Sequence, residues 1–404
     1  MQSLAESSTA NFSPSQSVAK SRAAAGTWCC YAVLAGATSI VIGVLWDISW
    51  HQTIGRDTFW TPAHLAIYLG GVLGGLSCGW LVLKTTFKGS VEERAASVRF
   101  WGFRGPLGAW LCIWGSIAMA TSAPFDNWWH NAYGLDVRIL SPPHSVLALG
   151  MYAIALGALL MMLAWQNRAA TAEKSSGSGL FVYLGGILLV MVAVFVTEYS
   201  FPNRQHTALF YQVSCGLYPS ILAAVGRAAK LRWAATLSAV VYLLIVGATV
   251  WILPLFPATP KLAPIYNPVD HMVPPAFPLL LLVPAFAIDV LLRWFKSADG
   301  WRGWIKDWLV ALVMGTAFFS LFLAVQWYFA KFILSPAANN WFFAGNRGWG
   351  YGVRPGAWQT KFWENETWVH NPVTLKGLAI ALVLAIVSAR IGLGRGKWMA
   401  KVKR

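Results

Sequence analysis

The stretch 47-DISWHQTIGRDTFWTPAH-64 lies between two apolar runs and places one carboxylate and two imidazoles between them. Asp47 and His51 are four residues apart, so on a helix they lie on one face. Pro62 favours the first turn of a second helix, which sets His64 close to the start of that helix. One Asp and two His side chains delivered from adjoining helix ends are typical of a three-ligand metal site.

The same arrangement recurs in residues 126–144. Asp126 and His130 are again four residues apart, and Ser-Pro-Pro-His at 141–144 repeats Thr-Pro-Ala-His at 61–64. One residue is inserted before the last histidine, His144. A single copy could equally be an interfacial Asp–His pair that caps helix ends, but matched spacing in two copies favours a metal site. Two imidazoles and one carboxylate suit copper, zinc or iron and do not choose among them.

The composition is that of a polytopic membrane protein. Of the 404 residues, 57% are hydrophobic and only 11% charged, with a mean hydropathy of +0.54, whereas soluble domains carry about 25% charged residues. The formal charge of +16 does not indicate nucleic acid as a partner, because the basic residues occupy short segments between apolar runs. The five cysteines fall inside apolar runs without a CxxC pattern, which favours packing over disulfides.

The apolar runs predict an all-α, polytopic transmembrane helical bundle of about ten spans, each long enough to cross a hydrocarbon core of about 30 Å. Basic connections alternate with weakly charged ones. This pattern predicts that both termini are cytoplasmic and that both metal motifs, with all seven histidines, lie on the outer side of a cell membrane (inner or intracytoplasmic). The predicted spans are 27–48, 62–84, 106–124, 142–165, 179–201, 207–226, 233–256, 273–295, 307–334 and 374–393.

The chain divides into three predicted parts. Residues 1–26 form a cytoplasmic N-terminal tail. Residues 27–232 form a metal-binding region, in which two parallel helical-hairpin repeats are followed by two further spans. Residues 233–404 add transmembrane spans and a long outer loop at 335–373, whose sequence indicates no particular chemistry.

Three further carboxylates are candidates for the sites. Asp57 and Asp136 each follow the first His of a triad by six residues. They could hold a His ring nitrogen from outside the ligand set, or they could be turn residues paired with Arg56 and Arg138. Glu198, near the outer end of the fifth predicted span, could add an oxygen ligand or be an interfacial residue.

The first motif resembles the C-type subunit of the copper-containing membrane monooxygenases, the particulate methane, ammonia and short-alkane enzymes. That type of subunit carries an Asp-x3-His-x12-His triad in a Trp-His-Gln…Arg-Asp-Thr…Thr-Pro-x-His context, and this chain matches it at 47–64. The resemblance implies that Asp47, His51 and His64 are copper ligands in transmembrane helices. It covers roughly residues 30–230, so the chain is similar to a divergent and enlarged form of that subunit.

The family also has a second triad nearby, with spacings x3 and x13, which corresponds here to Asp126, His130 and His144. In the family this triad tends to begin with Asn, whereas this chain has Asp126. The ligand charge therefore differs, and the resemblance leaves copper, zinc or another metal open at this second site.

The resemblance implies a copper-dependent monooxygenase subunit that oxidises a small, gas-like substrate (ammonia, methane or a short alkane) with O2. It also implies partner subunits of the A and B types beside the lipid bilayer. Trp46, Trp50, Phe59 and Trp60 are then expected to exclude water from the site. Two other functions stay open: a copper- or zinc-binding membrane protein for metal transport or delivery, and a non-catalytic paralogue within an oxidase complex.

Overall fold

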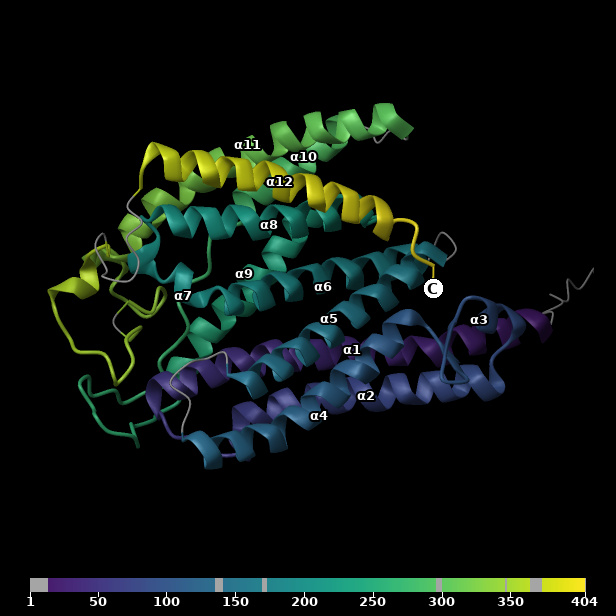
Figure 1. Ribbon diagram of the computed structural model, residues 1–404, viewed down its shortest axis with the longest axis horizontal. Helices are drawn as coiled ribbons and strands as arrows, with labels where there is room; N and C mark the ends of the chain where they lie inside the picture. Colours follow the sequence, from purple (N-terminus) through teal and green to yellow (C-terminus); the bar gives the residue numbers. More distant parts are fainter. Residues whose placement is uncertain are drawn as a thin grey trace, which may run out of the picture.

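The chain folds into a bundle of long helices packed side by side (Figure 1). The computed structural model describes residues 14–134, 141–168, 173–295, 300–345, 347–363 and 373–403. Within these ranges, nine helices are long and apolar enough to cross a membrane. The prediction of a multi-pass helical membrane protein is therefore confirmed at this level.

The nine long helices are α1 (Pro14–Thr53), α2 (Pro62–Lys88), α4 (Leu107–Tyr133), α5 (Pro142–Arg168), α6 (Glu173–Phe195), α8 (Ala208–Ala228), α9 (Ala234–Ile252), α11 (Gly300–Ile333) and α12 (Leu375–Met399). The shorter elements are α3 (Val91–Ala95), α7 (Thr197–Ser200), α10 (Leu282–Trp294) and the 3-10 turns η1 (Pro202–Arg204), η2 (Leu253–Leu255), η3 (Pro336–Ala338) and η4 (Ala357–Thr360). An antiparallel hairpin of β1 (Val98–Phe100) and β2 (Phe103–Gly105), which the all-α prediction omits, joins α3 to α4.

The predicted span 273–295 is helical only in its second half. Its helix, α10, has 13 residues, or about 20 Å at 1.5 Å per residue, which is shorter than a hydrocarbon core of about 30 Å. Residues 273–281 form no helix, because Pro274, Pro275 and Pro278 cannot continue one. Side chains of other segments provide hydrogen-bond partners for the backbone of this irregular stretch. The Leu279 N–H, for example, donates to the hydroxyl of Tyr242, at 3.0 Å.

The two metal-motif hairpins are held by close backbone packing. In the α4–α5 pair, a Cβ on Gly115 would lie 2.6 Å from the carbonyl oxygen of Gly150, and a Cβ on Gly150 would lie 2.7 Å from that of Gly115. In the α1–α2 pair, Gly36 faces Gly70 in the same reciprocal way. Such small residues let helix backbones approach closely, which is a principal source of helix association in lipid.

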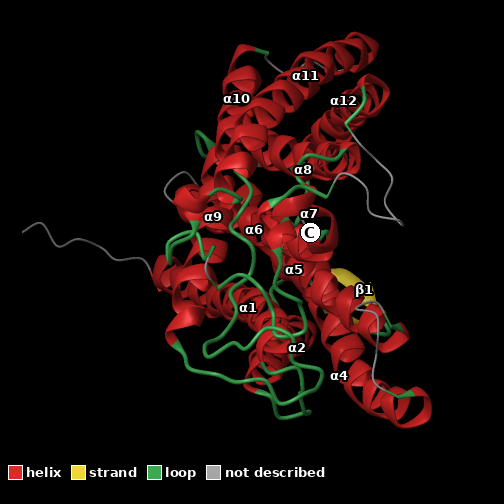
Figure 2. Cartoon of the chain, turned by 90° about the vertical axis from the view of Figure 1, so that its left-hand side faces the viewer, coloured by secondary structure: helices red, strands yellow, loops and turns green. Residues whose placement is uncertain are grey.

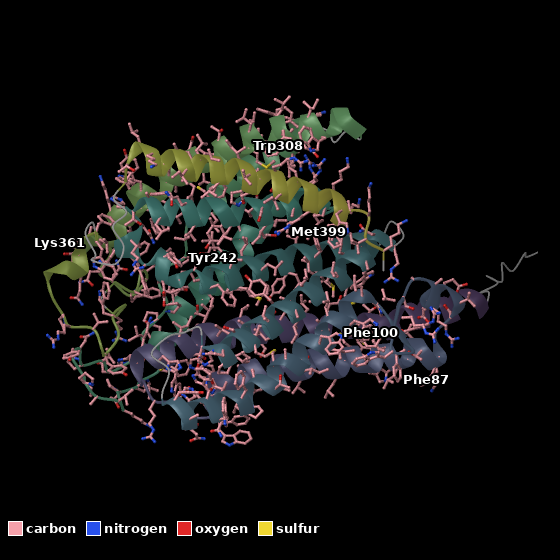
Figure 3. The ribbon with its side chains drawn as sticks, in the orientation of Figure 1. Phe87, Phe100, Tyr242, Trp308, Lys361 and Met399 are labelled. Atoms are coloured by element: carbon pink, nitrogen blue, oxygen red, sulfur yellow. The ribbon has the colours of Figure 1, made fainter. Side chains whose placement is uncertain are left out.

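The segments that connect the long helices lie at the two ends of the bundle. The α1–α2 and α4–α5 junctions, α7 and the loop before α10 gather at one end, on the left of Figure 1, whereas α3 and the described C-terminus lie at the other. Figure 2 looks onto the first of these ends and shows loops covering part of it. Figure 3 places Lys361 at this end and Phe87 and Phe100 towards the opposite one.

The histidines gather with these connections. All six histidines of the described residues lie on segments of this loop-covered end, which we call the site end. His370 lies outside the described residues.

Candidate metal centre

The first motif folds into a helix end, a turn and a helix start, as predicted. Helix α1 continues to Thr53 and carries Asp47 and His51 on one face, because the two residues are one turn apart. Gly55 then turns the chain with a φ of +81°, a conformation that favours glycine. Pro62 begins α2 and brings His64 back beside the end of α1.

The four ionisable groups of this motif converge. The Nε2 atom of His64 lies 3.1 Å from Asp47 Oδ1 and 3.4 Å from Asp57 Oδ2. The Nε2 atom of His51 lies 3.7 Å from Asp47 Oδ2 and 3.6 Å from Asp57 Oδ2. Both carboxylates thus lie against both imidazoles, and Asp57 is nearly as close to the ring nitrogens as Asp47 is. We call Asp47, His51, Asp57 and His64 site 1.

The hydrogen bonds of site 1 leave room for a cation. Nδ1 of His64 lies 2.9 Å from the carbonyl oxygen of Thr58, which can only accept, so this ring nitrogen carries the hydrogen. In the neutral ring, Nε2 then presents a lone pair to two carboxylates, an arrangement that a proton or a metal ion must neutralise. Asp47 Oδ1 is buried and accepts no hydrogen bond of regular geometry. An imidazole fixed through its other nitrogen by a carbonyl is the usual setting of a metal-ligating His.

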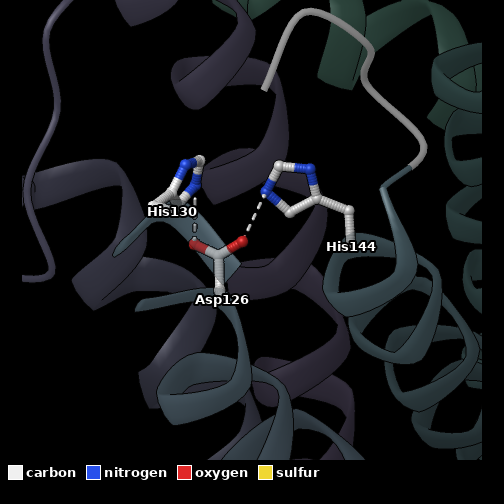
Figure 4. A group of neighbouring side chains, drawn as sticks. All are labelled: Asp126, His130 and His144. Carbon is white, nitrogen blue, oxygen red and sulfur yellow. Dashed lines mark ion pairs between the residues drawn. The ribbon is translucent and has the colours of Figure 1, made fainter. Parts of the chain in front are cut away.

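The second motif makes a tighter group, which we call site 2 (Figure 4). It consists of Asp126 and His130 near the end of α4 and His144 near the start of α5. Asp126 lies between the two rings, with His130 Nε2 at 3.3 Å from Oδ2 and His144 Nε2 at 3.4 Å from Oδ1. One ligand atom from each residue lies within 4.8 Å of the others. Nδ1 of His130 again faces a carbonyl, that of Gly134, at 3.3 Å.

Both donor sets fit a metal ion, and they fit to different degrees. Two ligands about 2.1 Å from one ion lie up to about 4.2 Å apart, which small side-chain movements achieve in site 2. In site 1 no such three-atom group within 4.8 Å occurs among the described residues, so its ligand atoms would have to move further to bind one ion. Site 1 offers two carboxylates and site 2 one. Imidazole and carboxylate donors without thiolate accept copper, zinc or iron.

The structure separates the accessory candidates. Asp57 belongs to site 1, whereas Asp136 lies outside the described residues. Glu198 is exposed on α7 and is not part of the three-residue group of site 2.

Two further histidines of the site end have other partners. His206 is stacked between Trp327 and Phe362, with ring centroids 3.6 Å away on both sides. His271, in the loop before α10, pairs with Asp270 at 2.8 Å and so lowers the pKa of that carboxyl.

The sequence motifs did not identify Tyr68, a residue that lies beside both sites. Tyr68 follows His64 by one turn of α2, with the two ring centroids 6.2 Å apart. It lies within electrostatic reach of Asp47 and Asp57 in site 1 and of Asp126 in site 2. Its i+4 spacing from His64 is the signal that could have found it.

The expected aromatic wall is incomplete. Trp60 is 72% exposed and Phe59 48% exposed, so neither excludes water from site 1. Trp46 and Trp50 instead pack against the buried cluster of Ile54, Leu253 and Met272. His51 has a side-chain exposure of 49% and His144 of 37%, so both sites are open to solvent on one side.

Comparisons of the chain with protein-family models, curated proteins and solved structures find no match.

Proposed function

We propose that this chain is the metal-bearing subunit of a copper-dependent membrane monooxygenase that oxidises ammonia, methane or a short alkane with O2. The observation that carries the proposal is the convergence of both Asp-x3-His…His motifs, each from its own helical hairpin, into groups whose imidazole nitrogens lie against carboxylate oxygens, with metal-ligand spacing at site 2. The resemblance of residues 47–64 to the C-type subunit of those enzymes supplies the choice of copper and of the reaction.

Each residue then has a defined role. His51 and His64 present ring nitrogens at site 1, and Asp47 supplies an anionic oxygen that offsets the ion's charge. Thr58 fixes the His64 ring through Nδ1, so Nε2 stays aimed at the carboxylates. Copper, when bound, supplies one-electron and O2 chemistry. Asp126, His130 and His144 hold copper, zinc or another metal at site 2 in the same way.

The proposal includes an orientation and partners. The site end faces the outer side of an inner or intracytoplasmic cell membrane, with both termini cytoplasmic, because the basic connections gather at the opposite end. Partner subunits of the A and B types complete the enzyme, as the resemblance implies.

One observation favours a second function. The open sides of His51 and His144 give metal ions and chelating partners direct access, as a protein of copper or zinc transport or delivery requires. Such a protein binds the same ions at the same triads but needs no O2 and no partner subunits.

His51→Ala in the purified full-length protein tests the metal site. In metal-free protein reloaded with Cu2+, we expect the copper content to fall from two ions per chain to one, because site 2 is intact, while His271→Ala leaves it at two. Copper is measured by elemental analysis after dialysis against a weak chelator. Unchanged copper in His51→Ala contradicts site 1. Substrate-dependent oxygen uptake in native membranes then separates the oxygenase from the metal-handling protein.

A further inference from the structure

The turn that follows His51 is contacted at every residue by the C-terminal part of the chain. The Tyr351 N–H donates to the Gln52 carbonyl at 2.9 Å. The Val273 N–H donates to the Thr53 hydroxyl at 2.7 Å, and the Lys261 N–H to the Ile54 carbonyl at 2.9 Å. The Ile54 side chain is buried against Leu253 and Met272.

The fourth residue of the turn, Gly55, packs so closely against Tyr351 that it leaves no space for a side chain. A Cβ at Gly55 would collide with the hydroxyl group of Tyr351. Tyr351 is itself fixed, because its carbonyl accepts from the N–H groups of Tyr266 and Asn267, both at 2.9 Å. The Asn267 side chain also donates to the Trp349 carbonyl at 2.9 Å, so the two contacting segments are bonded to each other. We call these segments, residues 253–273 and 347–354, the cap.

The second motif has no counterpart of the cap within the described residues. Its glycine, Gly134, has nearly the same φ, +86°, but a Cβ there would meet no atom within 4 Å. Asn131, Ala132 and Tyr133, which correspond to the turn of site 1, are all exposed. The two motifs are thus alike in sequence and differ in what covers them.

We infer that the cap is a positioning device for site 1, and this inference rests on the proposed metal-binding function. It fixes residues 52–55, and with them the distance between His51 on α1 and Asp57 before α2. The ligands of site 1 are therefore preorganised by the cap, whereas the described residues place no such cover on the turn of site 2. It follows that Cu2+ leaves site 1 more slowly than site 2, and that the slow release depends on the fit between Gly55 and Tyr351.

The test compares Gly55→Ala with Gly134→Ala in the full-length protein in lipid nanodiscs. Both substitutions place a Cβ at positive φ, so they share the backbone strain, but only Gly55→Ala meets the cap. Gly55→Ala is made with site 2 removed (His130→Ala, His144→Ala), and Gly134→Ala with site 1 removed (His51→Ala, His64→Ala). Cu2+ is the probe, followed by its electron paramagnetic resonance spectrum and its rate of removal by a chelator.

We expect Gly55→Ala to speed Cu2+ release about 10–100-fold, as loss of a supporting contact around a metal site does, and to change the Cu2+ spectrum. Gly134→Ala should do far less. Tyr351→Ala added to Gly55→Ala removes the collision and should restore much of the slow release and the original spectrum. Equal effects of the two glycine substitutions, or no rescue, would overturn the inference.

Hydrogen exchange of residues 52–55 in metal-free protein keeps the two proposals apart. Slow exchange that Gly55→Ala accelerates supports the cap even if no Cu2+ binds, in which case the proposed function fails alone. Fast exchange in the unaltered protein overturns the cap. Thr53→Val leaves the buried Val273 N–H without its acceptor and should also accelerate the exchange of residues 52–55. This variant replaces Gly55→Ala in the test if Gly55→Ala does not fold.

Discussion

Asp57 and Asp47 both face the imidazoles of site 1, but their carboxylates are placed differently. Asp57 Oδ2 lies 3.6 Å from Nε2 of His51 and 3.4 Å from Nε2 of His64. Asp47 Oδ1 is closer to His64, at 3.1 Å, is buried and accepts no hydrogen bond of regular geometry. The two carboxylates therefore contribute unequally to holding a cation.

We expect Asp57→Ala to weaken copper binding at site 1 about 10–100-fold, the range for a group that supports a ligand. Asp47→Ala should weaken it further, because it removes the oxygen closest to His64. Competition with a chelator of known affinity measures both, in protein that lacks site 2. An equal loss of affinity in the two variants would mean that Asp57 is itself a metal ligand and contributes as much to copper binding as Asp47 does.

Among the helices, the hairpins that carry the sites depend on glycine contacts. Gly115→Ala places a methyl group 2.6 Å from the Gly150 carbonyl oxygen, so α4 and α5 must move apart. We expect a loss of about 1–3 kcal/mol in the free energy of unfolding, the usual cost of overpacking. Gly79→Ala on α2 is the control, because its Cβ would meet nothing within 4 Å. Thermal unfolding in detergent compares the two, and similar melting temperatures would contradict the close-packing account.

The start of α9 depends on one buried carboxylate from another helix. Asp289 of α10 accepts hydrogen bonds from the N–H groups of Ala235 and Thr236, at 3.2 and 2.8 Å, and from the Thr236 hydroxyl. It thus caps a helix to which it does not belong. Asp289→Ala should cost about 1–3 kcal/mol of stability by leaving these donors unsatisfied. Unfolding by denaturant measures the cost, and a loss no larger than that of the exposed Asp270→Ala would contradict this role.

The orientation of the entire bundle in the membrane can be tested directly. The five native cysteines are free and buried, so new surface cysteines can be labelled selectively. Leu375, which is 89% exposed, begins α12 at the site end, and Val91, which is 81% exposed, begins α3 at the other. In intact cells, an impermeant maleimide should label Leu375→Cys and not Val91→Cys. The reverse result would put the site end inside.

Local rules of sequence account for most of the bundle and for the members of both triads. Nine of the ten predicted spans correspond to long helices of the described residues, because burial in lipid depends on local apolar composition and length. Prolines at the starts of α2 and α5 and i, i+4 spacing at the ends of α1 and α4 place the ligands, since these are local rules too. The broken span at 273–281 was predictable from its three prolines, although apolar composition alone indicated a full helix.

The cover over the turn of site 1 comes from long-range packing. Thr53 and Val273 are 220 positions apart, and no periodicity or spacing in a single sequence records such a contact. The cap over site 1, the fit of Tyr351 to Gly55 and the exposure of Gly134 all depend on which loops fold over the site end. Two sequence motifs that are almost the same thus differ among the described residues in their turns, one covered by the cap and one exposed, because segments distant in the chain set the surroundings of a local pattern.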